Sequence, residues 1–169
     1  MDSSDEKYLR RCLELAREAL AESEVPVGCV VAYEGVVIGE GRNRVNEFRN
    51  ATRHAEMVAF DHVISWTHNN GILLAEVLPR CTLYANVEPC IMCSGAIVQL
   101  NIGRIVYGCN NERFGGFGTV LNVPETMDKK LAVKSGLFVD EAIELLKKFY
   151  AGENPNAPES KCKRKKTGN

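Results

Sequence analysis

The sequence predicts an α/β protein in which helices cover both faces of a mixed β-sheet. Two observations lead to this prediction. Helix-like and strand-like segments alternate along the chain, and residues 27–33 (VGCVVAY) are apolar throughout, as in a strand that is buried on both faces. A chain of 169 residues also has the length of one domain. We therefore expect one layered domain followed by a short tail.

The N-terminal part of the chain predicts a helix and then a β-hairpin. The helix is indicated by apolar residues three and four positions apart, namely Leu9, Cys12, Leu13, Ala16 and Leu20. The strand at 27–33 is followed by a two-residue Glu-Gly turn and a second strand-like run at 36–43 (VVIGEGRN). Because the first strand is so apolar, we expect it to lie inside the sheet.

The remaining elements follow from composition and from helix stop signals. Residues 51–71 predict a helix, since they contain no internal Gly or Pro and end in Asn-Asn-Gly, a good left-handed stop. We expect a strand at 81–87, a helix from about Cys90 to Leu100, and a strand at 104–108. The Gly- and Asn-rich residues 109–122 predict a loop, and residues 139–150 predict the last helix.

Composition and cysteine usage predict an intracellular protein, in the nucleus, the cytoplasm or both. No apolar run approaches the roughly 18–20 residues of a membrane span, and the N-terminus is acidic and polar, so we expect neither a membrane segment nor a secretory signal. The seven cysteines are an odd number and do not suit a secreted disulfide framework. Close cysteine pairs therefore indicate metal or redox chemistry.

Positive charge is concentrated at the C-terminus. The chain has a formal net charge of −1, but its last nine residues contain five Lys or Arg and no acid, so the first 160 residues carry −6. We expect one folded domain at 1–150 and a flexible basic tail at 151–169. A basic run of this kind is usually a solvated end, and the alternatives are a nuclear signal or a nucleic-acid contact. The candidate RNA-binding residues are Lys161, Lys163, Arg164, Lys165 and Lys166.

One pair of cysteines, Cys90 and Cys93, is close in sequence and lies at the start of a predicted helix. This spacing aims both sulfurs from the first turn, where the helix dipole favours thiolates. A Cys-x-x-Cys pair by itself is compatible with a redox site or with half a zinc site. The chain lacks the thioredoxin-like context of a redox pair, and it has no second Cys-x-x-Cys for a four-cysteine structural site.

His54 is a candidate third ligand, and Glu56 lies two residues after it. Three protein ligands leave one position of a tetrahedral zinc open, as in catalytic sites. A glutamate beside such a site can carry protons to and from water. Taken singly, a histidine near a helix start most often caps the helix, and a glutamate in a first turn usually interacts with the helix dipole. Their combination with the two cysteines favours a catalytic site.

The segments HAE and PCIMC match the H-x-E and P-C-x-x-C signature of zinc nucleobase deaminases. Together with EVPVGCVV, GRNRV, TRHAEM, LYANVEPCIMCSGAI and RIVYG, they give a resemblance that covers residues 7–150. The chain resembles the cytidine deaminase-like superfamily and, within it, the tRNA adenosine deaminases that convert wobble adenosine to inosine. NERFGG and GENPNAP are more similar to the catalytic subunit of the eukaryotic two-subunit enzyme than to the bacterial homodimer.

The resemblance implies a three-layer α/β/α fold, the cytidine deaminase-like fold, with a central mixed sheet of about five strands. It implies that Zn²⁺ is the cofactor and that the reaction is hydrolytic. The implied metal ligands are His54, Cys90 and Cys93, and the implied proton shuttle is Glu56.

The resemblance also implies two contacts to the substrate base. Val27 would pack on the flipped base, and Asn43 would form a hydrogen bond with it. Each residue has a simpler explanation as well. Val27 suits the start of a buried strand, and Asn43 suits a turn that caps a loop.

The implied partners are tRNA and a second deaminase-like subunit, identical to this chain or different from it. Phe149 and Tyr150 are followed by neutral to acidic residues, where bacterial relatives carry arginines, so we expect phosphate contacts from the tail or from the partner. Two other functions stay open: deamination of free cytidine, deoxycytidylate or guanine, and a non-catalytic RNA-binding subunit with structural zinc. Glu56 argues against the second, because a structural site has no use for a proton carrier.

Overall fold

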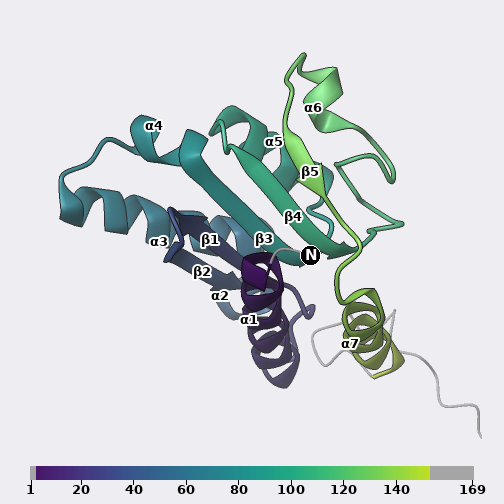
Figure 1. The fold of residues 1–169 in the computed structure, drawn as a ribbon. Helices are drawn as coiled ribbons and strands as arrows, with labels where there is room; N and C mark the ends of the chain where they lie inside the picture. Colours follow the sequence, from purple (N-terminus) through teal and green to yellow (C-terminus); the bar gives the residue numbers. More distant parts are fainter. Residues whose placement is uncertain (1–2, 153–169) are drawn as a thin grey trace, which may run out of the picture.

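Five strands form a mixed sheet in the order β2-β1-β3-β4-β5 (Figure 1). The computed structural model describes residues 3–152. The strands are β1 (Gly28–Tyr33), β2 (Val36–Arg42), β3 (Cys81–Val87), β4 (Arg104–Cys109) and β5 (Ala132–Lys134). β1 is antiparallel to β2 and β3, whereas β3, β4 and β5 are parallel. The predicted mixed sheet is confirmed, and so is the interior position of the first hairpin strand.

Helices cover both faces of this sheet, which confirms the predicted three layers (Figure 1). The N-terminal and C-terminal helices pack on one face, and the long central helix packs with the helix after β3 on the other. The helical elements are α1 (Ser3–Ala21), α2 (Val45–Phe48), α3 (Ala55–Asn70), α4 (Leu74–Val77), the 3-10 turn η1 (Leu78–Arg80), α5 (Ile91–Gln99), α6 (Val123–Thr126) and α7 (Val139–Ala151).

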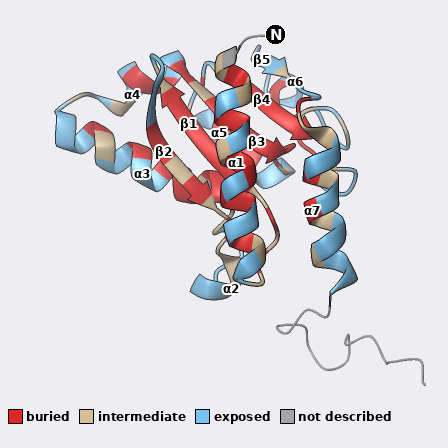
Figure 2. Ribbon diagram, turned by 60° about the horizontal axis from the view of Figure 1, so that its bottom comes forward, coloured by how far each residue is buried: buried red, intermediate tan, exposed pale blue. Residues whose placement is uncertain are grey.

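The apolar sequence of β1 follows from its burial on both sides (Figure 2). Val30 and Ala32 pack with the buried face of α1, and Cys29 and Val31 pack with α3 and α5. Successive side chains of a strand point to opposite faces, so every position of a doubly covered strand has to be apolar. Figure 2 shows this strand, β3 and β4 as the most continuously buried part of the sheet.

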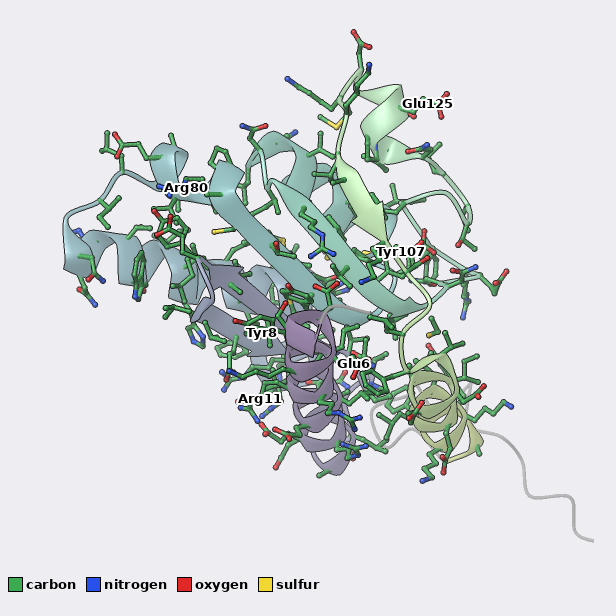
Figure 3. The ribbon with its side chains drawn as sticks, in the orientation of Figure 1. Glu6, Tyr8, Arg11, Arg80, Tyr107 and Glu125 are labelled. Atoms are coloured by element: carbon green, nitrogen blue, oxygen red, sulfur yellow. The ribbon has the colours of Figure 1, made fainter. Side chains whose placement is uncertain are left out.

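α1 is fixed to the sheet by a polar contact as well as by its apolar face. Asp5 is fully buried, and its carboxylate accepts hydrogen bonds from Arg104 (2.9 and 2.8 Å), Lys134 (2.6 Å) and the Tyr84 hydroxyl (3.0 Å). The Tyr8 ring, labelled on α1 in Figure 3, packs on the Tyr84 ring with their centroids 4.9 Å apart. One carboxylate thus joins α1 to three strands.

Several expected boundaries were wrong. Residues 51–54 are irregular, and the second helix begins at Ala55 because His54 has an extended backbone. The helix expected from about Cys90 to Leu100 runs from Ile91 to Gln99 with Cys90 as its N-cap, which agrees with the expectation to within one residue. β5 and the three four-residue helices were not expected. Residues 110–122 form an irregular loop as predicted, with two isolated bridges, Cys90–Gly115 and Phe117–Asn122, whereas Cys109 belongs to β4.

Two expectations concern the ends and surface of the chain. Within residues 3–152, no helix is long and apolar enough to cross a membrane. The last helix continues to Ala151, one residue beyond the expected 150. The rest of the predicted basic tail, including all five of its candidate RNA-binding residues, lies outside the described residues.

Candidate metal centre and active site

The candidate ligands come from the starts of two helices that meet at the carboxyl end of β3. His54 is the N-cap of α3, and Cys90 is the N-cap of α5. Both have extended backbones (φ −70°, ψ 161° and φ −68°, ψ 166°), and neither side chain caps its own helix. An N-cap side chain ordinarily accepts a hydrogen bond from a free N–H group in the first turn of its helix. Because His54 and Cys90 form no such bond, their imidazole and thiol can point away from their own helices.

The two helix starts bring three donor atoms together. The Nδ1 atom of His54 lies 3.4 Å from the Sγ atom of Cys90 and 3.5 Å from that of Cys93. All three ligand atoms lie within 4.8 Å of one another, and no other such group of three is found among residues 3–152. Two sulfurs and one imidazole nitrogen are a donor set that suits Zn²⁺, and three ligands leave a fourth tetrahedral position. The residues present therefore fit a catalytic metal.

The two thiols hold their protons with different strengths. The hydrogen bond from Cys93 and the nearby His54 ring lower the pKa of Cys90 to about 4. The same contact with Cys90, together with burial, raises the pKa of Cys93 above its usual range. The contact with Cys90 also raises the pKa of His54. A metal that takes all three as ligands has to displace the protons of Cys93 and of the imidazole, so binding is expected to release protons.

Glu56 lies in the first turn of α3 and is 3% exposed. Burial, and secondarily the negative charge of Cys90, raise the pKa of its carboxyl group, which also accepts a hydrogen bond from Cys93. A carboxyl group with a raised pKa beside a metal site is suited to take and return a proton. Glu56 is therefore a buried carboxyl group in contact with one of the candidate ligands.

Val27 and Asn43 lie side by side. Val27 precedes β1, is half-buried and packs against the core cluster that contains Ala55. Asn43 follows β2 and is buried, and its backbone N–H donates to the carbonyl of Val27 at 3.0 Å. Its Nδ2 donates to Glu24 at 2.9 Å, so a buried carboxylate determines which way the amide faces.

Three buried polar residues beside the site were not singled out from the sequence. Glu24 accepts hydrogen bonds from Asn43 and from the backbone of α2. Asn86 accepts from Gly28 at 2.8 Å and donates to the Pro26 carbonyl at 3.0 Å, on either side of Val27. Glu88 accepts from the backbone of the loop at 111–119. Their one signal in the sequence is that each lies within a segment that carries the resemblance, EVPVGCVV for Glu24 and LYANVEPCIMCSGAI for Asn86 and Glu88.

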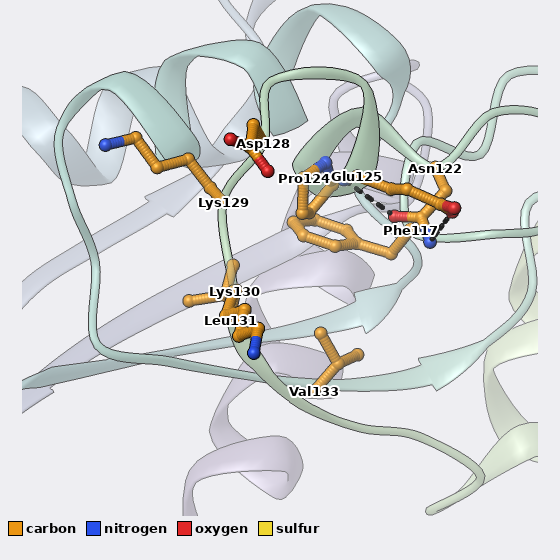
Figure 4. Close-up of a pocket in the computed structure, with 9 residues that line it drawn as sticks. All are labelled: Phe117, Asn122, Pro124, Glu125, Asp128, Lys129, Lys130, Leu131 and Val133. Carbon is orange, nitrogen blue, oxygen red and sulfur yellow. Dashed lines mark hydrogen bonds between the residues drawn. The ribbon is translucent and has the colours of Figure 1, made fainter.

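A cavity lies elsewhere in the molecule. It measures about 530 Å³ and is lined by Phe117, Asn122, Lys129, Leu131 and other residues of the segment from the 109–122 loop to β5 (Figure 4). Asn122 in its wall is held by the Glu125 side chain at 3.0 Å. None of the three candidate ligands lines this cavity, so we place the active site at the two helix starts.

Known families and relatives agree with this site. The sequence model of the cytidine and deoxycytidylate deaminase zinc-binding region matches residues 2–109, which include the three candidate ligands and Glu56. The tRNA-specific adenosine deaminase 2 of Xenopus tropicalis is 48% identical over 98% of this chain and 99% of its own length. The chain belongs to the tRNA-specific adenosine deaminase family. This deaminase also matches a longer relative, the tRNA-specific adenosine deaminase subunit tad2 of Schizosaccharomyces pombe, at 40% identity over 98% of this chain and 42% of the relative.

A solved structure supports the fold of this deaminase. It comes from studies of A-to-I editing by tRNA:A34 deaminases at the wobble position of transfer RNA. It is 32% identical in sequence, superposes with a TM-score of 0.72, and covers 83% of this chain and 99% of its own. The cytidine deaminase-like fold implied by the sequence motifs is thereby confirmed.

Proposed function

We propose that this deaminase converts adenosine to inosine at the wobble position of tRNA anticodons by zinc-dependent hydrolysis. The observation that carries the proposal is the buried Glu56 carboxyl group beside the cluster of His54, Cys90 and Cys93. The names of the relatives and of the solved structure supply the substrate.

The metal ligands in this proposal are His54, Cys90 and Cys93, whose donor atoms lie close enough together to share one ion. When bound, zinc supplies Lewis acidity that makes water acidic enough to act as a nucleophile near neutral pH. The N-cap positions of His54 and Cys90 support the proposal, because they aim both side chains away from their own helices.

Glu56 performs the proton transfers. It takes a proton from the attacking water and delivers it to the N1 atom of the adenine ring, while the water oxygen bonds to C6. It then takes the remaining hydroxyl proton and gives it to the amine, which leaves as ammonia as the C6–N bond breaks. The product carries a carbonyl at C6, and the carboxylate is regenerated with one water consumed. The burial of Glu56 supports this role, because it keeps the proton affinity of the carboxyl group high.

Val27 and Asn43 are proposed to hold the flipped base. Val27 offers an apolar surface at the edge of the core, and Asn43 offers an amide whose orientation is set by Glu24. The backbone hydrogen bond between Asn43 and Val27 ties the two together, so that a change in either residue is expected to raise KM.

The proposed partners are tRNA and a second deaminase-like subunit. The fission yeast relative is named a subunit, which supports assembly with a second subunit. We further propose that residues 1–150 form the catalytic domain and that the basic residues of the tail at 151–169 contact RNA. Nucleus and cytoplasm are both compatible with this function.

The function is tested by incubating a tRNA transcript that has adenosine at the wobble position with the full chain, alone and with a candidate partner subunit. Sequencing is expected to show inosine at that position. Parallel incubations with free cytidine, deoxycytidylate and guanine are expected to release no ammonia. Ammonia from a free base or nucleotide with unchanged tRNA would contradict the proposed substrate. Zinc binding without deamination of any of these substrates would favour a non-catalytic subunit.

A further inference from the structure

We propose that Glu88 is a positioning residue that fixes Cys90 for metal binding by holding the loop at 111–119 against the start of α5. The inference rests on the proposed zinc site, because Cys90 is one of its ligands. Glu88 lies two residues before Cys90, within the segment LYANVEPCIMCSGAI, and no role was expected for it.

The carboxylate of Glu88 is 1% exposed and is bonded by backbone N–H groups. Its Oε2 accepts from the N–H of Asn111 at 3.0 Å, and its Oε1 accepts from those of Phe117 at 2.8 Å and Thr119 at 3.3 Å. Among residues 3–152, the hydrogen bonds that offset the burial of this negative charge come from backbone N–H groups and not from a lysine or arginine side chain. A buried carboxylate without such donors is strongly unfavourable, so side chain and loop depend on each other.

The loop that is hydrogen-bonded to Glu88 also forms hydrogen bonds with the residues on both sides of Cys90. The N–H of Ile91 donates to the Phe114 carbonyl at 2.8 Å, and the N–H of Gly116 donates to the Pro89 carbonyl at 3.0 Å. Cys90 itself forms an isolated antiparallel bridge with Gly115. The backbone around Cys90 is therefore held by hydrogen bonds to the loop, and the loop is held in turn by its hydrogen bonds to Glu88.

Two glycines allow this close approach. A Cβ atom at Gly115 would lie 2.3 Å from Oε2 of Glu88, and one at Gly116 would lie 2.3 Å from Oγ of Ser94 in α5. The loop backbone thus rests directly on the carboxylate and on α5, the helix of the two cysteine ligands. A contact this close transmits a movement of Glu88 to the start of α5.

These contacts with the loop matter because α5 itself does little to fix the position of the Cys90 side chain. It is an N-cap without a side-chain cap bond, and its thiol has to stay 3.4 Å from the His54 Nδ1 atom. Groups that orient a ligand typically change metal affinity or activity by about 10- to 100-fold when they are removed. Loss of the Glu88 contacts should therefore appear first as faster loss of zinc.

The test measures zinc release from the full-length protein to a chromophoric chelator, without RNA. Glu88→Gln replaces one carboxylate oxygen with an NH₂ group, which cannot accept from the loop, and is expected to speed release by about 10-fold or more. Glu88→Asp keeps the charge but shortens the reach and is expected to give an intermediate rate. Hydrogen exchange of the Ile91 and Gly116 amides should accelerate in Glu88→Gln, because their bonds belong to the clamped segment.

Asp5→Asn is the matched control, since Asp5 is also a buried, hydrogen-bonded carboxylate but lies under α1 on the opposite face. It is expected to lower stability and to release zinc at the wild-type rate. A wild-type release rate in Glu88→Gln, or equal acceleration in Asp5→Asn, would overturn the role of Glu88. A wild-type protein that binds no zinc at all would instead contradict the proposed metal site itself, and this inference with it.

Discussion

At the scale of single residues, most of the buried polar side chains lie in or beside the candidate site. Those among the described residues are Asp5, Glu24, Asn43, Glu56, Thr67, Asn86, Glu88 and Ser94. All but Asp5 and Thr67 are candidate site residues or contact segments beside one. Burying a polar group is unfavourable unless it is hydrogen-bonded, so their concentration here indicates that the site, and not general stability, explains their presence.

Replacing Glu56 tests the proton-transfer step. Glu56→Gln keeps the shape of the side chain but removes the proton carrier, so the rate of inosine formation is expected to fall at least about 100-fold. Zinc content and melting temperature should be unchanged, because a neutral amide is no harder to bury than a carboxyl group whose pKa is raised by burial. Single-turnover kinetics and metal analysis measure both quantities. Glu76→Gln, on the exposed surface of α4, is the control, and near-normal activity of Glu56→Gln would remove Glu56 from the mechanism.

The four candidate site residues could be predicted from the sequence because they form two local pairs, His54 with Glu56 and Cys90 with Cys93. Each pair lies at the start of one helix, and its spacing is typical of zinc deaminases. Glu88 was missed for a physical reason. Its partners are backbone N–H groups 23 to 31 residues away, and no local pattern of side chains records a bond to a backbone.

At the scale of elements, close packing of α1 on β1 holds the start of this interior strand, which directly follows Val27. A Cβ at Gly28 would lie 2.2 Å from the Cys12 carbonyl oxygen and 2.6 Å from the Leu15 Cβ. Gly28→Ala is therefore expected to lower the free energy of unfolding by about 2–3 kcal/mol, as measured by urea denaturation. Gly95→Ala in α5 has open space and is expected to raise it by about 0.5–1 kcal/mol. Equal effects of the two substitutions would contradict this packing.

The Asp5 cluster makes the stability of the α1 layer depend on pH. The hydrogen bonds from Arg104, and less strongly those from Lys134 and Tyr84, hold the pKa of Asp5 well below its usual range. Because the folded-state pKa lies below the unfolded value of about 3.9, this contribution is complete at higher pH and is lost as the pH falls below that value. Asp5→Asn is expected to cost about 3 kcal/mol at pH 7.

The check on Asp5 is urea denaturation of both proteins between pH 7 and pH 2. The difference in unfolding free energy between wild type and Asp5→Asn should shrink progressively in the acid range. A difference that stays constant with pH would show that the carboxylate charge is not what stabilises the contact.

Long, strongly patterned elements could be predicted and short ones could not. The strand at 81–87 was found with its bounds, since it is apolar and flanked by clear breaks. β5 was missed because Ala132 and Val133 are exposed and only three residues pair, so the strand has no apolar pattern. The start of α3 was misplaced because an extended His54 is required to aim the imidazole away from the helix, and propensity does not encode that requirement.

At the scale of the whole molecule, an acidic body of residues 1–160 carries −6 and the last nine residues carry +5. Deleting the residues after Asn156 is expected to weaken tRNA binding. It should also reduce the slope of log affinity against log salt by up to about 4, given five cations at roughly 0.7–0.9 each. Filter binding at several salt concentrations measures the slope, and thermal unfolding should be unchanged. Equal slopes for the full-length and truncated proteins would show that the basic tail does not contact the RNA phosphates.

The central claim is that His54, Cys90 and Cys93 hold one zinc ion beside Glu56. X-ray absorption of the zinc-loaded full-length protein tests it most directly. We predict one zinc per chain with two sulfur ligands and two lighter ligands, a single sulfur in Cys93→Ser, and two sulfurs in the control Cys81→Ser, whose thiol lies outside the cluster. A spectrum with four sulfurs or with none, or one that Cys93→Ser leaves unchanged, would contradict the account.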